Sequence, residues 1–302
     1  MEDAALLRPP GTSPLVFTVD FITPVVDDPE TFGAIAAANA ISDVYAMGGD
    51  PRVALAVGGF PRDVLSLEVI EAVFRGGRDK AAEAGCAIVG GHTVVDPELK
   101  YGLCVIGEVA SETAFTQTAA RPGDVLVLTK PVGTGIASQA AKKGGIEPHE
   151  YDAAVASMGT LNRVASEVAR EHGVRAATDV TGFGLLGHLH HLLDASGVSA
   201  RLSASAVPAF GFAERLAGAG IVPGGSRRNL NYVNPHVRWD DSVSEARRLI
   251  LADAQTSGGL LLAVPPERSD SLVRGLKERG SLAQAVIGEV EAGVGGRVQV
   301  DP

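Results

Sequence analysis

The chain has 302 residues, enough for one large or two ordinary domains. Apolar residues make up 45% and charged residues 21%, which is typical of a globular protein in water, and the formal net charge of −10 argues against binding nucleic acid or an anionic membrane through a basic surface. The sequence shows no secretory leader pattern and no apolar run of the roughly 18 residues that a membrane span needs, so we expect a cytoplasmic protein.

Strands and helices alternate in the first third of the chain. Residues 15–19 predict a buried strand that ends at Asp20. Asp28 followed by Pro29 predicts the start of an alanine-rich helix that runs to about Met47, because Asp accepts a hydrogen bond from a free amide of the first turn and Pro suits the first helical position. Further elements are expected as a strand at 52–58, a helix at about 66–84, a short strand at 86–89 and a strand at 101–109.

A second unit of the same kind follows a segment of small and polar residues at 110–123, which predicts a linker. Strands are expected at 124–129, 175–180, 259–264 and about 284–290, and helices at about 151–172, after the glycine turn at 182–187 to about 196, near 241–252 and at 267–279. The alternation indicates an α/β or α+β architecture with two domains, which we place at residues 1–112 and 113–302.

Three carboxylates stand where strands end or on a helix face. Asp20 and Asp179 end predicted strands, and Asp43 follows Asn39 by four residues, so these two share a face of their helix. Together with Asp3 they offer the oxygen ligands that Mg²⁺ prefers. Spacing alone leaves a second interpretation open, in which Asn39 and Asp43 only mark the solvent face of the helix.

The segment Gly182–Gly187 matches the letter pattern of the dinucleotide-binding fingerprint. That fingerprint needs an acidic residue at the end of the next strand, and the strand predicted near 198–202 has none. A bare carboxylate at Asp179, just before the turn, would also repel a phosphate. We therefore prefer a phosphate bridged by a metal ion at the N-terminus of the following helix, and a turn needed only for packing remains the alternative.

A glycine turn with polar neighbours is expected after the strand at 86–89. Glycine lets backbone amides approach an anion, and His and Thr add hydrogen bonds, so these residues are candidate nucleotide contacts. The candidates are Gly91, His92 and Thr93.

The histidines and cysteines predict little chemistry. His188 and His191 lie three apart on a predicted helix and could form half of a zinc site, but we favour ordinary helix-surface histidines because no further ligand stands at a supporting spacing. Cys86 and Cys104 lie in apolar runs and are predicted to be small buried residues without a disulfide. The sequence has no P-loop, nucleophile elbow or kinase signature, so any ATP site lies outside those plans.

Seven segments, in the same order and spread over nearly the whole chain, resemble selenophosphate synthetase (selenide, water dikinase). Part of one of them, residues 42–49, is shared with the wider superfamily of aminoimidazole ribonucleotide synthetase, thiamine-monophosphate kinase and a hydrogenase maturation factor. The segments around Asp20, Asp179 and Gln255 single out the selenium enzyme. The seven segments are 18–29, 38–49, 90–93, 128–131, 178–188, 222–226 and 255–263.

The resemblance implies a two-domain, aminoimidazole ribonucleotide synthetase-like fold in which each domain has a mixed sheet packed with helices. It also implies a homodimer with ATP held near the interface, and a reaction that converts selenide, ATP and water to selenophosphate, AMP and phosphate. Asp3, Asp43 and Asp179 match the family's magnesium ligands. The positions that match its nucleotide contacts are Asp20, Gly91, His92 and Thr93.

One part of the family pattern is not found. The family has a glycine-rich segment with a Cys or selenocysteine, and a Lys three residues later, ahead of the region that matches Met1–Ala5. Cys86 and Cys104 do not stand in a matching position, and the first lysine is Lys80. We therefore expect the nucleophile and its lysine upstream of Met1, with no catalytic residue in the chain itself. A non-catalytic ATP-binding member and a superfamily kinase or ligase with another acceptor, which would form ADP, remain alternatives.

Overall fold

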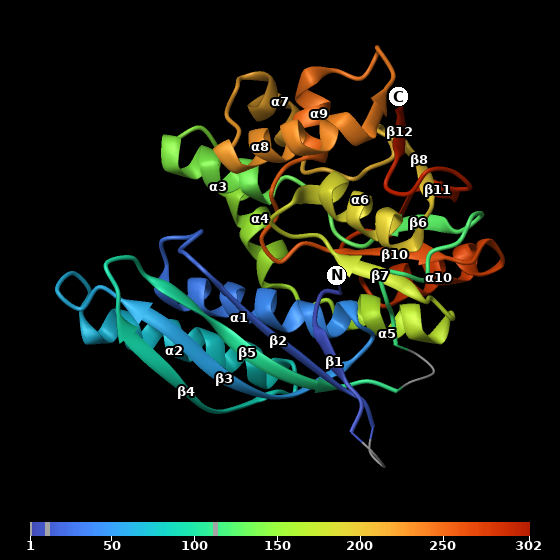
Figure 1. The fold of residues 1–302 in the computed structure, drawn as a ribbon. Coiled ribbons are helices and arrows are strands. Elements are labelled where there is room, and N and C mark those ends of the chain that lie inside the picture. The colour runs from blue at the N-terminus through green and yellow to red at the C-terminus, as the bar shows by residue number, and fades with distance from the viewer. Residues whose placement is uncertain (1, 10–12, 111–113) are drawn as a thin grey trace.

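The computed structural model describes residues 2–9, 13–110 and 114–302 and contains two mixed sheets, each packed with helices (Figure 1). This confirms the predicted α/β (α+β) fold. The predicted domain boundary between residues 112 and 113 lies outside the described residues. No helix of the described part is long and apolar enough to cross a membrane.

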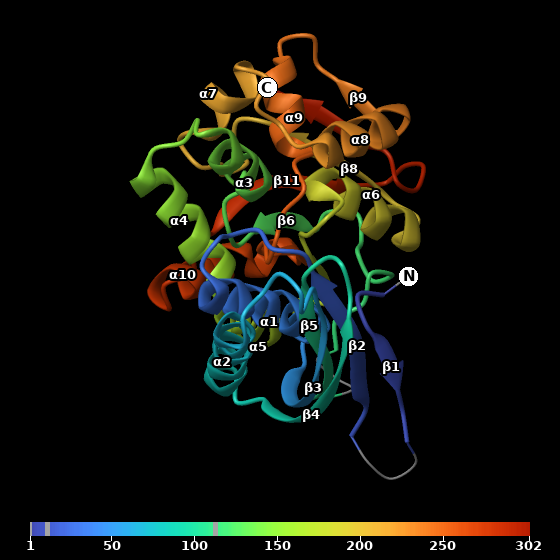
Figure 2. The same cartoon turned by 90° about the vertical axis from the view of Figure 1, so that its left-hand side faces the viewer.

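The first sheet is formed by the N-terminal third of the chain, with the strand order β1-β2-β5-β3-β4. Neighbouring strands are antiparallel except β3 and β4, which are parallel. Two helices cover one face of this sheet, and the other face carries no helix of the described residues (Figure 2). The elements are β1 (Ala5–Leu7), β2 (Leu15–Ile22), α1 (Pro29–Ala46), β3 (Asp50–Phe60), α2 (Leu67–Glu83), β4 (Ala87–Val95) and β5 (Lys100–Glu108).

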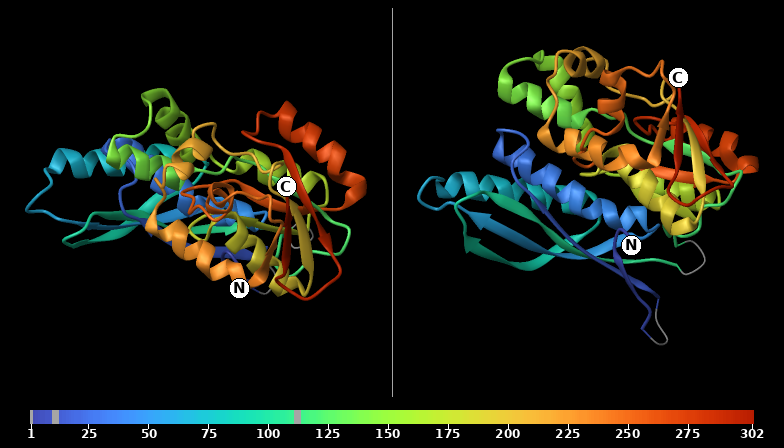
Figure 3. Two further views of the ribbon diagram at one scale, coloured as in Figure 1. Left: turned by 90° about the horizontal axis from the view of Figure 1, so that it is seen from above. Right: turned by 45° about the horizontal axis from the view of Figure 1, so that its top comes forward.

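Helix α1 is buried on almost every side because it runs between the first sheet and the rest of the molecule (Figure 1). Its start is as predicted: Asp28 is the N-cap and accepts a 2.7 Å hydrogen bond from the Thr31 amide, and Pro29 follows. The right-hand view of Figure 3 shows α1 beside α2 over the sheet. The two helices pack so closely that a Cβ on Gly76 would lie 1.8 Å from the Glu30 carbonyl oxygen.

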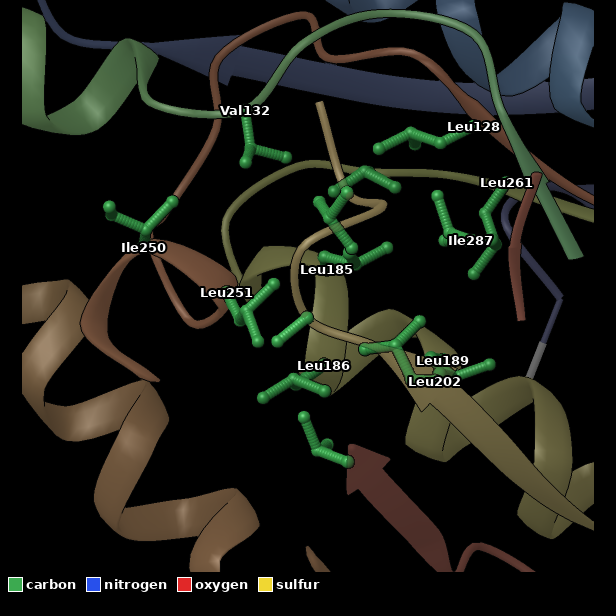
Figure 4. Packing of buried hydrophobic residues seen from close by; sticks show 14 of the residues in the cluster. Leu128, Val132, Leu185, Leu186, Leu189, Leu202, Ile250, Leu251, Leu261 and Ile287 are labelled. Carbon is green, nitrogen blue, oxygen red and sulfur yellow. The ribbon is translucent and has the colours of Figure 1, made fainter. Parts of the chain in front are cut away.

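The second sheet has the order β7-β10-β6-β11-β8-β12-β9, and its main core contains Leu128, Leu186, Leu202, Leu261 and Ile287 (Figure 4). Its strands are β6 (Val125–Leu128), β7 (Ala176–Asp179), β8 (Ser199–Ser203), β9 (Val237–Trp239), β10 (Leu260–Val264), β11 (Ala285–Glu291) and β12 (Val298–Asp301). The helices around it are α3 (Thr134–Lys143), α4 (Pro148–Gly159), α5 (Arg163–Glu171), α6 (Gly184–Ser196), α7 (Ala213–Gly218), α8 (Gly224–Val233), α9 (Glu245–Leu251) and α10 (Pro266–Glu278).

Three sequence-based expectations about single elements are wrong. Strand β2 continues to Ile22, so Asp20 lies within it rather than at its end. Strand β4 continues through 90–93, because each of these residues pairs with β3. The helix expected at 151–172 is two helices, since the chain turns extended at Thr160 and the buried Lys130 binds the carbonyl groups at the end of α4.

Candidate metal and nucleotide site

Two of the predicted site carboxylates face each other across β2 and α1. Alternation along β2 directs Thr18 and Asp20 toward α1, where Asn39 and Asp43 lie one turn apart. The Thr18 hydroxyl donates a hydrogen bond to Asp43 Oδ2, and the Asn39 amide donates one to Asp20 Oδ2. Asn39 is only 4% exposed and Asp43 is partly buried, so the interpretation that they mark a solvent face is wrong.

The other two carboxylates come from the start of the chain and from the second sheet. Asp3 precedes β1, and its Oδ1 accepts hydrogen bonds from Gln117 Nε2 at 2.7 Å and from the Thr178 hydroxyl at 2.8 Å. Asp179 ends β7 and is 1% exposed. Asp3 Oδ2 and Asp179 Oδ2 are buried and have no hydrogen-bond partner. Each of these two side chains therefore presents a free oxygen in a buried setting.

The four carboxylates lie close enough together to perturb one another. Burial, followed by the negative charge of Asp179, raises the pKa of Asp3 and of Asp43 well above the usual range. Burial also raises the pKa of Asp179 to about 6, and the charge of Asp20 adds to this. The pKa of Asp20 itself is raised by burial, against hydrogen bonds from the Phe21 backbone and Asn39. The structure thus brings all four predicted carboxylates into one buried, electronegative cluster.

This cluster has the chemistry of a site for a hard cation. Its donors are carboxylate oxygens, which suit Mg²⁺, and two of those oxygens are buried without a partner. A buried carboxylate without a partner is costly unless a cation or a proton neutralises it. Within the described residues, however, no group of three or more His, Cys, Asp or Glu side chains is already arranged to hold a metal ion. The residues thus fit the ion in the chemistry of their donor atoms.

A cavity of about 540 Å³ opens beside the cluster and is lined by residues of β2, α1, α3 and the loops near them. It extends from Asp20 and Asn39 to Gly182, Lys142 and Gln255. A larger hollow of about 620 Å³, lined by residues such as Phe210 and Arg247, contains none of the predicted site residues. The smaller cavity is therefore the one that the site chemistry points to, because Asp20 lines it.

The glycine turn before α6 is required for packing at one glycine and lines the cavity at another. Gly184 has φ 70°, and a Cβ there would lie 2.6 Å from the Ala252 carbonyl oxygen, so packing requires glycine at this position. Gly182 has open space around it and lines the cavity. His188 is buried, not on the surface as expected, and its Nε2 accepts the Thr181 amide at 3.1 Å. Burial lowers the pKa of His188 to about 3, so this imidazole is neutral, and its Nε2 is already hydrogen-bonded to the backbone of the turn.

The other three predicted nucleotide contacts do not lie near the carboxylates within one chain. Gly91, His92 and Thr93 lie on the exposed edge strand β4, and β5 and β3 separate β4 from Asp20 on β2. Three strand spacings amount to about 14 Å. Register also places His92 opposite Val57, on the outer face of the sheet, whereas Asp20 faces inward.

Neither cysteine belongs to the cluster. Cys86 is buried, and burial raises its pKa to about 11, so its thiol stays protonated and unreactive at neutral pH. Cys104 is a free, partly exposed cysteine on β5, where it pairs with Val19 and Leu55 in the first sheet. Both cysteines are free, as predicted. The predicted burial is confirmed for Cys86, whereas Cys104 is more exposed than expected.

Several contacts of the site could not be predicted from local pattern in the sequence. Gln117 lies in the predicted linker, yet its side chain reaches Asp3 and its backbone amide donates to the Glu2 carboxylate at 2.8 Å. Thr18 and Thr178 look like ordinary strand residues until their partners are known. These contacts join segments more than 20 residues apart, so local pattern could not predict them.

Comparisons with known proteins identify the family. The model "AIR synthase related protein, N-terminal domain" matches residues 1–109, and the corresponding C-terminal domain matches residues 121–301. Among solved structures, a thiamine-monophosphate kinase from Stenotrophomonas maltophilia K279a has a TM-score of 0.74 at 24% identity, covering 99% of this chain and 89% of that one. The hydrogenase maturation protein HypE in complex with ATP has a TM-score of 0.74 at 23% identity, covering 97% and 83%. At such identities these structures show the fold.

Curated relatives are much more similar in sequence. The selenide, water dikinase of Carboxydothermus hydrogenoformans is 46% identical over 285 residues, which cover 94% of this chain and 82% of that protein. The enzyme of the same name from Myxococcus xanthus is 47% identical over 294 residues, which cover 97% and 83%. The chain therefore belongs to the selenide, water dikinase family, within the wider group that shares the AIR synthase domains.

Proposed function

We propose that this chain binds ATP and makes selenophosphate, converting selenide, ATP and water to selenophosphate, AMP and phosphate. The observation that carries the proposal is the meeting of four carboxylates, from β2, α1, β7 and the start of the chain, beside a cavity of about 540 Å³. Family membership supplies the reaction, and the buried carboxylates supply a place for a metal-bound polyphosphate. We also propose the division into domains at residues 1–112 and 113–302.

We further propose that Asp3, Asp43 and Asp179 hold Mg²⁺ and that Asp20 contacts the nucleotide. Bound Mg²⁺ would neutralise charge on the phosphates, which a protein of net charge −10 would otherwise repel. The protein's own groups orient the site: Thr18 holds one oxygen of Asp43, and Asn39 holds one oxygen of Asp20. The free Oδ2 atoms of Asp3 and Asp179 support this assignment.

A homodimer would explain why the predicted nucleotide contacts lie apart within one chain. The outer face of the first sheet exposes apolar side chains, with Val19 59% and Phe21 51% exposed. Residues Phe21, Gly102, Val57 and His92 form one row across that face. We propose that two such faces pair and that the partner subunit supplies Gly91, His92 and Thr93 to the site that contains Asp20. An exposed apolar face of this kind favours burial against a second copy.

Mixed dimers test this arrangement. A subunit with Asp43→Ala is co-expressed with a differently tagged subunit with His92→Ala, and the doubly tagged dimers are purified. If one site uses Asp43 from one subunit and His92 from the other, each mixed dimer retains one intact site and binds about one nucleotide, whereas both homodimers bind poorly. Mixed dimers that bind no better than the homodimers would contradict a shared site.

Product analysis tests the reaction. When the chain is joined to the glycine-rich segment with Cys and Lys of the family pattern and supplied with ATP, Mg²⁺ and selenide, we expect AMP, phosphate and selenophosphate, measured by chromatography and by phosphorus NMR. ADP as the final nucleotide product would instead support a superfamily kinase or ligase with another acceptor. The positions of Cys86 and Cys104 favour a second candidate function, a non-catalytic member that binds ATP, since neither thiol is part of the cluster. Nucleotide binding without any AMP formation would support that candidate.

A further inference from the structure

A buried lysine lies behind the carboxylate cluster without being one of the predicted site residues. Lys130 follows β6 and is only 3% exposed. Its Nζ donates three hydrogen bonds, all to carbonyl oxygens: to Thr160 at 2.6 Å, to Ser257 at 2.8 Å and to Ser157 at 3.1 Å. An ammonium group has three protons, so this geometry uses every donor of the charged form. Burying such a group is costly, which calls for a structural or functional reason.

Ser257, one of its partners, has an unusual backbone. Its φ is 47°, and it is the only described non-glycine residue with a positive φ. Its hydroxyl is buried and has no hydrogen-bond partner, so the side chain does not stabilise this conformation. The backbone groups do: the Ser257 carbonyl accepts from Lys130, and the Ser257 amide donates to Asn39 Oδ1 at 2.7 Å. Strain of this kind persists only where the surroundings hold it.

These bonds form a continuous path to the site. Lys130 binds the Ser257 carbonyl, the Ser257 amide binds Asn39 Oδ1, and Asn39 Nδ2 binds the Asp20 carboxylate. The path begins after β6 of the second sheet and ends on β2 of the first, so it also crosses between the two halves of the molecule. Asn39 uses its acceptor on one side and its donor on the other, and this fixes which way its amide group points.

We infer that Lys130 is a positioning residue, which holds the Ser257 turn so that Asn39 orients the Asp20 carboxylate for the nucleotide. The inference rests on the proposed role of Asp20 in ATP binding. Lys130 touches neither Asp20 nor the cavity, and it acts through Ser257 and Asn39. Its other two bonds, to Ser157 and Thr160, anchor it at the C-terminal end of α4, where a cation also interacts favourably with the helix dipole.

A double-mutant cycle tests the path. The variants are Lys130→Met, Asn39→Ala and the double variant, and Lys143→Met, an exposed lysine on α3, is the matched control. Binding of a non-hydrolysable ATP analogue with Mg²⁺ is measured by calorimetry, and folding is checked by circular dichroism. We expect Lys130→Met and Asn39→Ala each to weaken binding about tenfold, which corresponds to the loss of one hydrogen bond to a charged group. Lys143→Met should bind like the wild type.

Non-additivity distinguishes positioning from a merely structural role. If Lys130 acts through Asn39, the double variant binds about as weakly as Asn39→Ala alone, because the path is already broken. Losses that multiply to about a hundredfold, or a folded Lys130→Met that binds like the wild type, would overturn the inference. If Lys130→Met does not fold, Lys130→Gln, which keeps an N–H donor, is put through the same cycle. A wild type that binds no nucleotide would count against the proposed function instead.

Discussion

Replacing Asp179 by Asn is expected to stabilise the metal-free protein while removing its response to Mg²⁺. Asp179 is 1% exposed, and burial raises its pKa from 3.8 to about 6. At about 1.4 kcal/mol for each pKa unit, the ionised carboxylate lowers the stability of the folded state by about 3 kcal/mol at pH 8. An uncharged amide of nearly the same shape does not have this cost, although it loses the ability to bind the ion.

The assay is denaturant unfolding at pH 8, in EDTA and in saturating Mg²⁺. We expect the variant to be more stable than the wild type in EDTA and to gain nothing from Mg²⁺, whereas the wild type gains stability on binding the ion. Asp253→Asn is the matched control. Asp253 is also fully buried, but its oxygens accept from the Ile136 amide, the Ser226 hydroxyl and the Gln255 amide group.

The control separates burial from metal binding, because burial also raises the pKa of Asp253, to about 7, while donors already occupy both of its oxygens. Whatever the change in its stability in EDTA, we expect Asp253→Asn to keep the Mg²⁺ response of the wild type, because Asp253 has no free oxygen to offer an ion. An Asp179→Asn variant that is less stable than the wild type in EDTA, or that still gains stability from Mg²⁺, would refute the view that this carboxylate is kept in place for a cation.

Three other predictions concern the pH dependence of stability, the packing of α1 on α2 and the burial of Cys86. The metal-free protein binds protons more tightly when folded than when unfolded, because the pKa values of Asp3, Asp43 and Asp179 are raised. Thermal scans should therefore show its stability falling as the pH rises from about 4 through 6. Adding Mg²⁺ at pH 8 should restore most of the lost stability. Gly76→Ala should lower the free energy of unfolding, measured with denaturant, by about 1–3 kcal/mol or more, because the new Cβ would meet the Glu30 carbonyl. Its control is Gly159→Ala, which has open space and should be neutral or slightly stabilising. Equal effects of the two substitutions would contradict the packing of α1 on α2. Cys86 should react with Ellman's reagent at pH 8 only when the protein unfolds, since burial raises its pKa to about 11, and rapid labelling of the native protein would contradict its placement.

The sequence predicted the elements whose signals are local. The cap at Asp28 and the proline after it mark the start of α1, as predicted. Elements whose causes lie elsewhere in the chain were missed or misjudged. The helix expected at 151–172 breaks because Lys130, some 30 residues earlier, binds its carbonyl groups. Strand β4 continues through two glycines because pairing with β3 overrides their preference for turns.

The site shows the same division between local and distant signals. The four carboxylates could be proposed from their places near strand ends and on a helix face, and the structure brings them together. What orients them could not be read from pattern, because Gln117, Thr178 and Ser257 meet their partners across gaps of 114, 175 and 218 residues. The placement of His92 three strands from Asp20 also needed the sheet order, which the sequence did not reveal.

The most direct test of the account is calorimetric titration with a non-hydrolysable ATP analogue, with and without Mg²⁺, for the wild type and for Asp43→Ala and Asp179→Ala. If the carboxylate cluster is the metal-bridged nucleotide site, the wild type binds at least about a hundredfold more tightly with Mg²⁺ than in EDTA, and both variants lose most of that gain. Equal nucleotide affinity in all three proteins, or an affinity of the wild type that does not depend on Mg²⁺, would contradict it.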